Sequence, residues 1–233
     1  MSNTITLAEL KTQARERADM ENSSFISDSE LTTYINQSYA DLYGILVTRY
    51  EDYFTIETTS TVTSGNDTIT LPTDFFKLRG LDLALDNSLN NFTVVTRADW
   101  NNRNQRDSNN SRLLRGQFNV SYRIIKDEIK LTPSLNAAGT YRLYYIPIYT
   151  PLVNDTDTPE TSISNQSWHE YIIVDAAIKM LEKEESNTKH LERQLMKLEE
   201  RIERAAANRD VHQPETVSDT SLLDYDPDFL YTR

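Results

Sequence analysis

The spacing of apolar residues changes twice along this chain, and the change divides it into parts that must fold differently. Apolar side chains recur every three or four residues up to about Tyr50 and again from about Trp168, which is the period of amphipathic helices. From Tyr53 the period becomes two, which is typical of strands with one buried face. Helical ends around a strand-rich middle predict an α+β fold.

The first helical part is predicted to be a helix hairpin. One helix covers residues 6–19 and opens with Thr6 and Glu9 at capping-box spacing. Ser27 and Glu30 repeat that spacing at the start of a second, longer helix. Because the connection between the two helices is short, we expect them to lie antiparallel.

The middle part is predicted to be a compact antiparallel β domain of about five to seven strands. Its first two runs, 54–58 and 68–71, flank a turn signal at residues 64–67 and are expected to pair with each other as a hairpin. A short helix that includes Trp100 is expected at 98–105. The other candidate strands are 78–85, 92–96, 118–125, 128–131 and 141–148.

Two further helices are predicted after a linker. The first opens with Ser167 and Glu170 at capping-box spacing and is apolar over more than half of its circumference, so it should be buried against the N-terminal hairpin. The second has one apolar seam on an otherwise charged surface, as expected of a helix that packs lengthwise on another. The residues of that seam are Leu191, Leu195, Leu198, Ile202 and Ala205.

These patterns predict a helical bundle with a β domain inserted between its two halves and an extended C-terminal tail. The expected segments are 1–52, the N-terminal helix hairpin; 53–150, the inserted β domain; 151–166, a linker; 167–209, the two C-terminal helices; and 210–233, a docking tail.

Residues that could carry catalysis or bind a metal occur at spacings that do not fit either task. The chain has no cysteine and three histidines, which excludes disulfides and thiolate zinc sites. His169-Glu170 starts like a zinc-protease helix, but Ile173 stands where the second histidine is needed. Asp155 and Asp157 resemble the start of a calcium loop whose remaining ligands are missing. We predict no catalytic residue, no metal ligand and no cofactor.

Two more features bear on chemistry. The five glycines are isolated, so the chain has no phosphate-cradling loop and no nucleophile elbow. Asp175 lies inside the apolar C-terminal helix, where it is either a functional carboxylate or a structural partner in a hydrogen bond. We favour the structural interpretation.

The net charge of −12 argues against a protein that grips phosphate backbones, because that task needs a basic surface. It is compatible with a passage through which DNA slides, since acidic walls would not retard it. No run approaches the roughly 18 apolar residues of a membrane helix, and the first residues do not resemble a secretory signal. We expect a protein made in the cytoplasm, without a membrane partner.

Two segments are candidate binding sites. A polar loop concentrates positive charge and could contact DNA phosphates or an acidic partner, or be only a solvated loop; its arginines are Arg103, Arg106, Arg112 and Arg115. The acidic tail carries apolar residues without a helical or strand period, which favours docking on a neighbouring protein over simple disorder. Those anchors are Leu222, Leu223, Tyr225, Phe229, Leu230 and Tyr231.

Three passages, in this order and spacing, resemble the head-to-tail adaptor, or connector, proteins of tailed double-stranded-DNA bacteriophages. The first joins the Leu7-Ala-Glu-Leu10 helix to Ile26–Leu31 and Tyr34–Tyr39. The second is Thr68–Phe75, and the third is the helix Trp168–Ala177 with its charged sequel. The resemblance spans most of the chain, and the inserted β domain is larger here than in the smallest adaptors.

The resemblance implies a structural virion protein rather than an enzyme. Such proteins form a closed ring of about twelve copies under the portal, built by head-to-tail contacts. The ring extends the DNA channel, joins the capsid to the tail, and serves genome packaging and DNA ejection. Its implied partners are the portal protein, reached by the C-terminal tails, further copies of itself, a downstream neck or tail protein, and passing double-stranded DNA bound without sequence specificity.

Two alternatives remain open. A more distal neck or tail component, such as a tail completion or fibre-attachment ring, would share the symmetry and the lack of chemistry. A tail-associated hydrolase would need two carboxylates brought together in a cleft, and the sequence gives no sign of such a pair.

Overall fold

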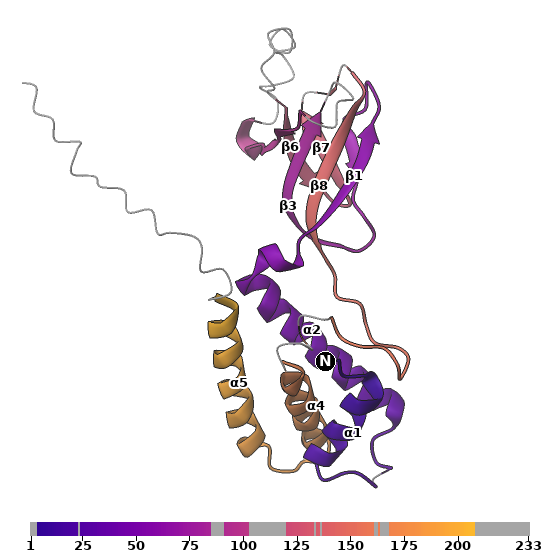
Figure 1. Ribbon diagram of the computed structural model, residues 1–233, viewed down its shortest axis with the longest axis vertical. Coiled ribbons are helices and arrows are strands. Elements are labelled where there is room, and N and C mark those ends of the chain that lie inside the picture. Colours follow the sequence, from indigo (N-terminus) through magenta and orange to yellow (C-terminus); the bar gives the residue numbers. More distant parts are fainter. Residues whose placement is uncertain are drawn as a thin grey trace, which may run out of the picture.

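The computed structural model shows an elongated molecule with helices at one end and strands at the other (Figure 1). The described part of the chain contains four helices and two four-stranded sheets, which confirms the predicted α+β class. The residues that the structure describes are 4–22, 24–84, 91–102, 120–132, 134–135, 137–160, 163 and 168–207.

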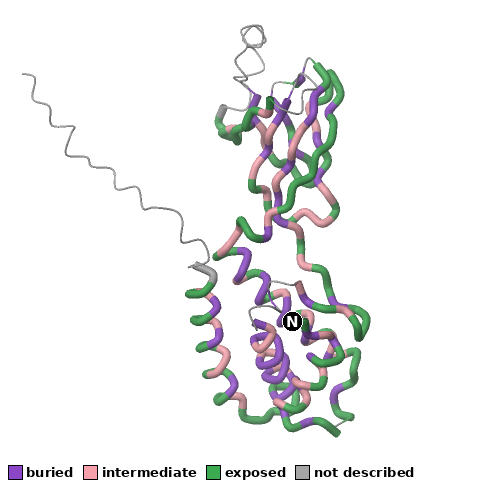
Figure 2. The backbone as a smooth tube through the Cα atoms, viewed as in Figure 1, coloured by how far each residue is buried: buried purple, intermediate pink, exposed green. Residues whose placement is uncertain are grey.

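The helices share one apolar core, to which the N-terminal helices and the C-terminal helices both contribute. Helix α4 lies at its centre: it contacts α1, α2 and α5, and nearly all of its apolar side chains are buried (Figures 1 and 2). The helices are α1 Leu7–Arg17, α2 Asp28–Arg49, α4 His169–Lys183 and α5 Lys189–Ala207.

Local capping signals fix the starts of two helices, α1 and α2. The capping box of α1 is confirmed, because Glu9 N donates to Thr6 Oγ1 at 3.3 Å and Thr6 N donates to Glu9 Oε2 at 2.8 Å. Ser27 caps α2 by accepting from Glu30 N. Helix α4 differs from the prediction: its N-cap is Trp168, without a side-chain cap, and the carboxylate of Glu170 pairs instead with Arg17 of α1. Ser167 lies outside the described residues.

The strands form two sheets that enclose a second apolar core, visible as the buried interior of the upper part in Figure 2. One sheet has the order β1-β8-β3-β4 and the other β2-β7-β6-β5. The strands are β1 Ile56–Val62, β2 Thr68–Thr70, β3 Phe75–Ala84, β4 Thr93–Val94, β5 Thr96–Arg97, β6 Ser121–Ile125, β7 Glu128–Thr132 and β8 Gly139–Pro147.

The predicted hairpin between the first two strands is wrong. β1 pairs antiparallel with β8, and β2 pairs with β7 in the other sheet. The turn itself exists, with Gly65 at φ 81, but it carries the chain from one sheet to the other. Val62 and Ile69, on either side of the turn, are both buried in the core between the sheets, so each sheet contributes one of them, and each strand finds its hydrogen-bonding partner in its own sheet.

Two details of the β prediction also need correction. The domain is not purely antiparallel, because β5 runs parallel to β6 over the pairs Thr96–Ser121 and Arg97–Tyr122. The described residues hold eight strands, two of them only two residues long, where about five to seven were expected. The short helix near Trp100 is a single 3₁₀ turn, η2 Trp100–Asn102.

The chain crosses between the two parts twice, and α2 holds both crossings. The outgoing crossing is the 3₁₀ turn η1 Glu51–Phe54, and the returning one follows β8. Asn36 of α2 clamps the returning chain with two hydrogen bonds to Leu152, donating to its carbonyl at 2.9 Å and accepting from its amide at 2.8 Å. The side chain of Asn36 therefore satisfies both backbone hydrogen-bonding groups of Leu152 and holds the returning segment against α2.

Aromatic side chains fill the junction between the two parts. Tyr43 packs edge-on against Phe54 of η1, with ring centroids 5.2 Å apart, and its hydroxyl donates to Pro147 O at 2.8 Å. One turn earlier, Tyr39 packs edge-on against Tyr149 at 5.3 Å. Tyr43 thus contacts both crossings at once.

Ion pairs brace the same junction from outside the aromatic cluster. Lys77 and Arg79 of β3 both pair with Glu51 of η1, and Arg79 also pairs with Asp52. On the returning side, Ile148 N donates to Asp74 O at 2.7 Å. Strand β3 is therefore tied to both crossings, which fixes the sandwich relative to α2.

Replacing Tyr43 by phenylalanine tests the junction. The ring packing is retained, but Pro147 O loses its hydrogen-bond donor, so Tyr43→Phe is expected to lower the free energy of unfolding by about 1–2 kcal/mol in urea denaturation. Tyr144→Phe is the matched control, because no described residue is hydrogen-bonded to the Tyr144 hydroxyl. Equal stability of the two variants would contradict the assigned role of Tyr43.

Candidate interaction surfaces

Both binding segments expected from the sequence lie outside the described residues. These are the tail anchors Leu222, Leu223, Tyr225, Phe229, Leu230 and Tyr231, and the loop arginines Arg103, Arg106, Arg112 and Arg115. Their roles stay predictions. What the structure describes is the surface next to each segment: the end of α5, from which the tail continues, and the end of the sandwich, from which the loop continues.

A groove lies between α2 and α5, close to the end of α5. It has a volume of about 590 Å³ and mixed polar and apolar walls. Arg49 and Glu203 form an ion pair across it at 3.0 Å, joining the last turns of the two helices. The lining residues are Ala40, Asp41, Gly44, Ile45, Thr48, Arg49 and Glu203.

Gly44 lines this groove and lies in the interior of a 22-residue helix. A glycine there destabilises the helix, because it adds backbone freedom to the unfolded chain. No neighbouring packing requires it, since a Cβ added at Gly44 would meet no atom within 4 Å. Sequence reasoning missed the groove, although an isolated glycine within a helical pattern was the available signal.

A second hollow, of about 460 Å³, lies at the end of the sandwich beside η2. Trp100 is 60% exposed there, and the guanidinium of Arg123 lies over its ring at 5.6 Å. Three further apolar residues are exposed on the strands, Val94 on β4 and Ile124 and Ile125 on β6. In the sequence, η2 ends at Asn102, immediately before the predicted basic loop that begins at Arg103.

Helix α5 has a strongly charged outer surface. Leu191, Leu198 and Ile202 are buried against the other helices, whereas Met196 is 64% exposed. The basic residues on its outer side are Lys189, Arg193, Lys197, Arg201 and Arg204. The predicted seam packs on the helical core at Leu191, Leu198 and Ile202, and Leu195 is partly buried there, but Ala205 is exposed. The opposite side of the helix is exposed.

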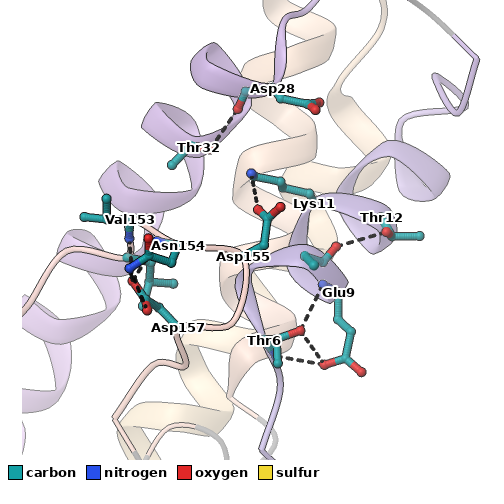
Figure 3. Close-up of polar contacts among 12 residues, drawn as sticks. Thr6, Glu9, Lys11, Thr12, Asp28, Thr32, Val153, Asn154, Asp155 and Asp157 are labelled. Atoms are coloured by element: carbon teal, nitrogen blue, oxygen red, sulfur yellow. Dashed lines mark hydrogen bonds and ion pairs between the residues drawn. The ribbon is translucent and has the colours of Figure 1, made fainter.

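The calcium-like motif is a structural turn. Asp157 accepts hydrogen bonds from the amides of Val153 and Asn154, both at 2.8 Å, and Asp155 pairs with Lys11 at 2.7 Å (Figure 3). The two amide bonds stabilise the carboxylate and lower the pKa of Asp157 below its ordinary value of 3.8. The carbonyls of both aspartates also accept from the first amides of α1, so the turn caps that helix.

The other candidate groups have structural surroundings as well. Asp175 pairs with Lys179 one turn along α4, in agreement with a structural role. His169 is partly buried, and burial lowers the pKa of its imidazole. Its neighbour Glu170 is held by Arg17. No group of three His, Asp or Glu side chains that could hold a metal ion occurs within the described residues.

Several titratable groups are shifted by burial in the helical core. Burial raises the pKa of the Tyr39 hydroxyl to about 12 and raises the pKa of Tyr43 and Tyr171 as well. Burial also raises the pKa of Glu160, whose backbone amide donates to Tyr39 Oη at 3.2 Å. In all four groups the pKa is shifted in the direction that disfavours the charged form, as expected of side chains packed in an apolar core.

In the described part of the chain, no helix is both long enough and apolar enough to cross a membrane. Comparison with known proteins identifies one family. The sequence model described as SU10 adaptor protein matches residues 5–220, which include every described helix and strand. No curated protein matches the chain.

Gly44→Ala is expected to raise the free energy of unfolding by about 0.5–1 kcal/mol, because alanine restricts the unfolded chain and its Cβ projects into open space. Gly65→Ala is the comparison with opposite sign: at φ 81, alanine should cost about 1–2 kcal/mol. Urea denaturation of both variants measures this. A destabilising Gly44→Ala would mean that the space beside Gly44 in the groove is filled.

Asp157→Ala is expected to lower the free energy of unfolding at pH 7. Because the pKa of Asp157 is depressed in the folded state, its contribution is present above pH 3.8 and is lost as the pH falls through the folded-state pKa. The stabilities of the variant and the original chain should therefore converge in acid. Adding calcium should leave the melting temperature unchanged, and a rise would restore the calcium-loop interpretation.

Proposed function

The chain belongs to the SU10 adaptor protein family of phage structural adaptors, and we propose that it acts as the head-to-tail adaptor of a tailed bacteriophage. In this role about twelve copies form a closed ring under the portal. The ring extends the DNA channel and joins the capsid to the tail, as a virion component that serves genome packaging and DNA ejection.

The observation that carries this proposal is the extent of the family match. It covers residues 5–220, so the likeness includes both helical ends, the sandwich and much of the tail, rather than one common module. A structural role agrees with the surroundings of the candidate groups, since Asp155, Asp157 and Asp175 are each engaged in ion pairs or turn hydrogen bonds.

We further propose a division of labour between the segments. The helices of 1–52 and 167–209 form one bundle that supplies the body of the ring, and the sandwich of 53–150 projects from it toward a neighbouring neck or tail protein. The linker 151–166 returns the chain to the bundle. The rigid junction around Tyr43 supports this division, because a projecting domain needs a fixed orientation to present one surface in every copy.

The tail 210–233 reaches the portal in this proposal. Its anchors give modest affinity one by one, and a ring makes them act together, since each bound tail raises the effective concentration of the next. The loop arginines Arg103, Arg106, Arg112 and Arg115 contact passing DNA or an acidic partner surface. The net charge of −12 keeps the remaining contacts with DNA weak.

Co-sedimentation with purified portal rings tests the proposal. The full chain is expected to sediment with the portal, and a version ending at Val211 is expected to lose most of that binding, because it lacks the anchors. A full-length chain with Leu222, Tyr225 and Phe229 replaced by serine is the matched control for truncation, since it keeps the length and the acidic charge.

The other outcomes have distinct meanings. Equal binding by the full and shortened chains would assign attachment to the helices instead of the tail. Binding by neither, together with binding to a purified tail protein, would replace the portal adaptor by a more distal neck or tail component.

A further inference from the structure

The outer side of α5 carries a line of basic residues, here termed the basic stripe: Lys189, Arg193, Lys197 and Arg201. They recur every four residues, so they lie on successive turns and span about 18 Å. All four are exposed, whereas Leu191, Leu198 and Ile202 of the same helix are buried. The stripe is thus an open, linear array of positive charge.

The stripe is unusual because its charges are not compensated. None of its four members forms an ion pair within the described residues, although the chain has an excess of acidic groups. Every other lysine and arginine of the four helices is paired: Lys11, Arg15, Arg17, Arg49, Lys179, Lys183 and Arg204. Four unpaired cations on successive turns therefore indicate a surface that can bind an anionic partner.

The acidic residues of α5 do not neutralise the stripe. Glu192 accepts a hydrogen bond from the hydroxyl of Thr188, and Glu200 pairs with Arg204 at 3.1 Å. Met196 lies beside the stripe and is 64% exposed, which adds an apolar contact point. A fitting partner is therefore an acidic peptide with interspersed apolar or aromatic side chains, since guanidinium groups also stack on aromatic rings.

The chain itself contains such a peptide directly after α5. The segment 208–233 carries six acidic residues against Arg209 and Arg233. The acids are Asp210, Glu215, Asp219, Asp224, Asp226 and Asp228, and they are interleaved with the apolar anchors of the tail. Charge and composition are both complementary to the stripe.

The tail also has the required reach. It continues from Ala207, about 9 Å of helix beyond Arg201 and about 27 Å beyond Lys189. The 12 residues from Ala207 to Asp219 span up to about 40 Å when extended, so the acids from Asp219 onward can lie along the whole stripe. Because tail and stripe belong to one chain, their effective concentration is in the millimolar range.

We propose that the acidic tail folds back and binds the basic stripe of α5 in the same copy while no other partner holds it. The inference rests on the proposed function of the tail as a docking segment and adds a second, internal site for it. Portal and stripe then compete for one peptide. DNA is a poorer occupant, because it must bind from solution, whereas the tail belongs to the same chain and is present at an effective concentration in the millimolar range.

Carbodiimide crosslinking of the full chain tests the contact, because it joins lysines only to carboxylates that touch them. Lys189 and Lys197 are expected to link to Asp219, Asp224, Asp226 or Asp228 in the monomer band after mass-spectrometric mapping. The links should decrease several-fold in about 1 M salt, where charges are screened within about 3 Å. Lys126, an exposed and unpaired lysine of the sandwich, is the internal control and should give no tail links.

Fluorescence transfer between two dyes gives a second readout, and the absence of native cysteine allows specific labelling. Dyes at Met196→Cys and Ser221→Cys are expected to show high transfer efficiency that drops when Arg193, Lys197 and Arg201 are replaced by glutamate. Replacing Lys126 and Lys130 by glutamate is the control and should leave the efficiency unchanged. Circular dichroism confirms that each variant is folded.

Four results would overturn the proposal: no stripe-to-tail links, links confined to a dimer band, links that persist in high salt, or stripe-dependent binding of a duplex DNA probe that leaves the tail links unaffected. The proposed function fails separately, because these measurements need no portal. If portal binding is absent but the links form, the internal contact stands alone. If the portal binds, neutralising the stripe should tighten that binding by roughly tenfold, since the competing contact is lost.

Discussion

The orientation of the whole molecule depends on the contacts of α2 with the two chain crossings. Tyr43 touches both of them, through its ring at Phe54 and its hydroxyl at Pro147, and Asn36 holds the returning chain by two backbone hydrogen bonds. Without these contacts, the helical core and the sandwich would be joined only by two connecting segments and could change their relative orientation. With them, α2 acts as a continuous support from the first helix to the base of the sandwich.

The same junction lies close to the end of α5, from which the tail continues. Arg49 and Glu203 join the last turns of α2 and α5, so the point from which the tail continues lies beside the C-terminal end of α2 (Figure 1). A partner that binds the tail therefore pulls on α5 next to the junction. In the proposed adaptor, this links portal attachment directly to the element that sets the direction of the sandwich.

Local signals in the sequence were sufficient for the helices. The capping box at Thr6 and Glu9 and the apolar periods of α2, α4 and α5 concern residues within a few turns of one another, and the structure confirms them. Strand partners were not predictable in this way, because the choice of β8 by β1 joins residues about 85 positions apart and is decided by burial across two sheets. The α2–α5 groove was missed for the same reason, since Gly44 and Glu203 meet only in the fold. The docking tail and the arginine loop stay predictions.

The distribution of charge on the helices also has a physical logic. In a chain with net charge −12, an unpaired cation readily finds an acidic neighbour, and the seven paired lysines and arginines of the helices show this tendency. Within the described residues, Lys189, Arg193, Lys197 and Arg201 stay unpaired because the carboxylates of α5 have other partners: Glu199 accepts from the hydroxyl of Tyr171, and Glu203 pairs with Arg49. An acidic segment that binds this stripe gains attraction without breaking an existing ion pair, so exchange between an internal and an external site needs little rearrangement of the helical core.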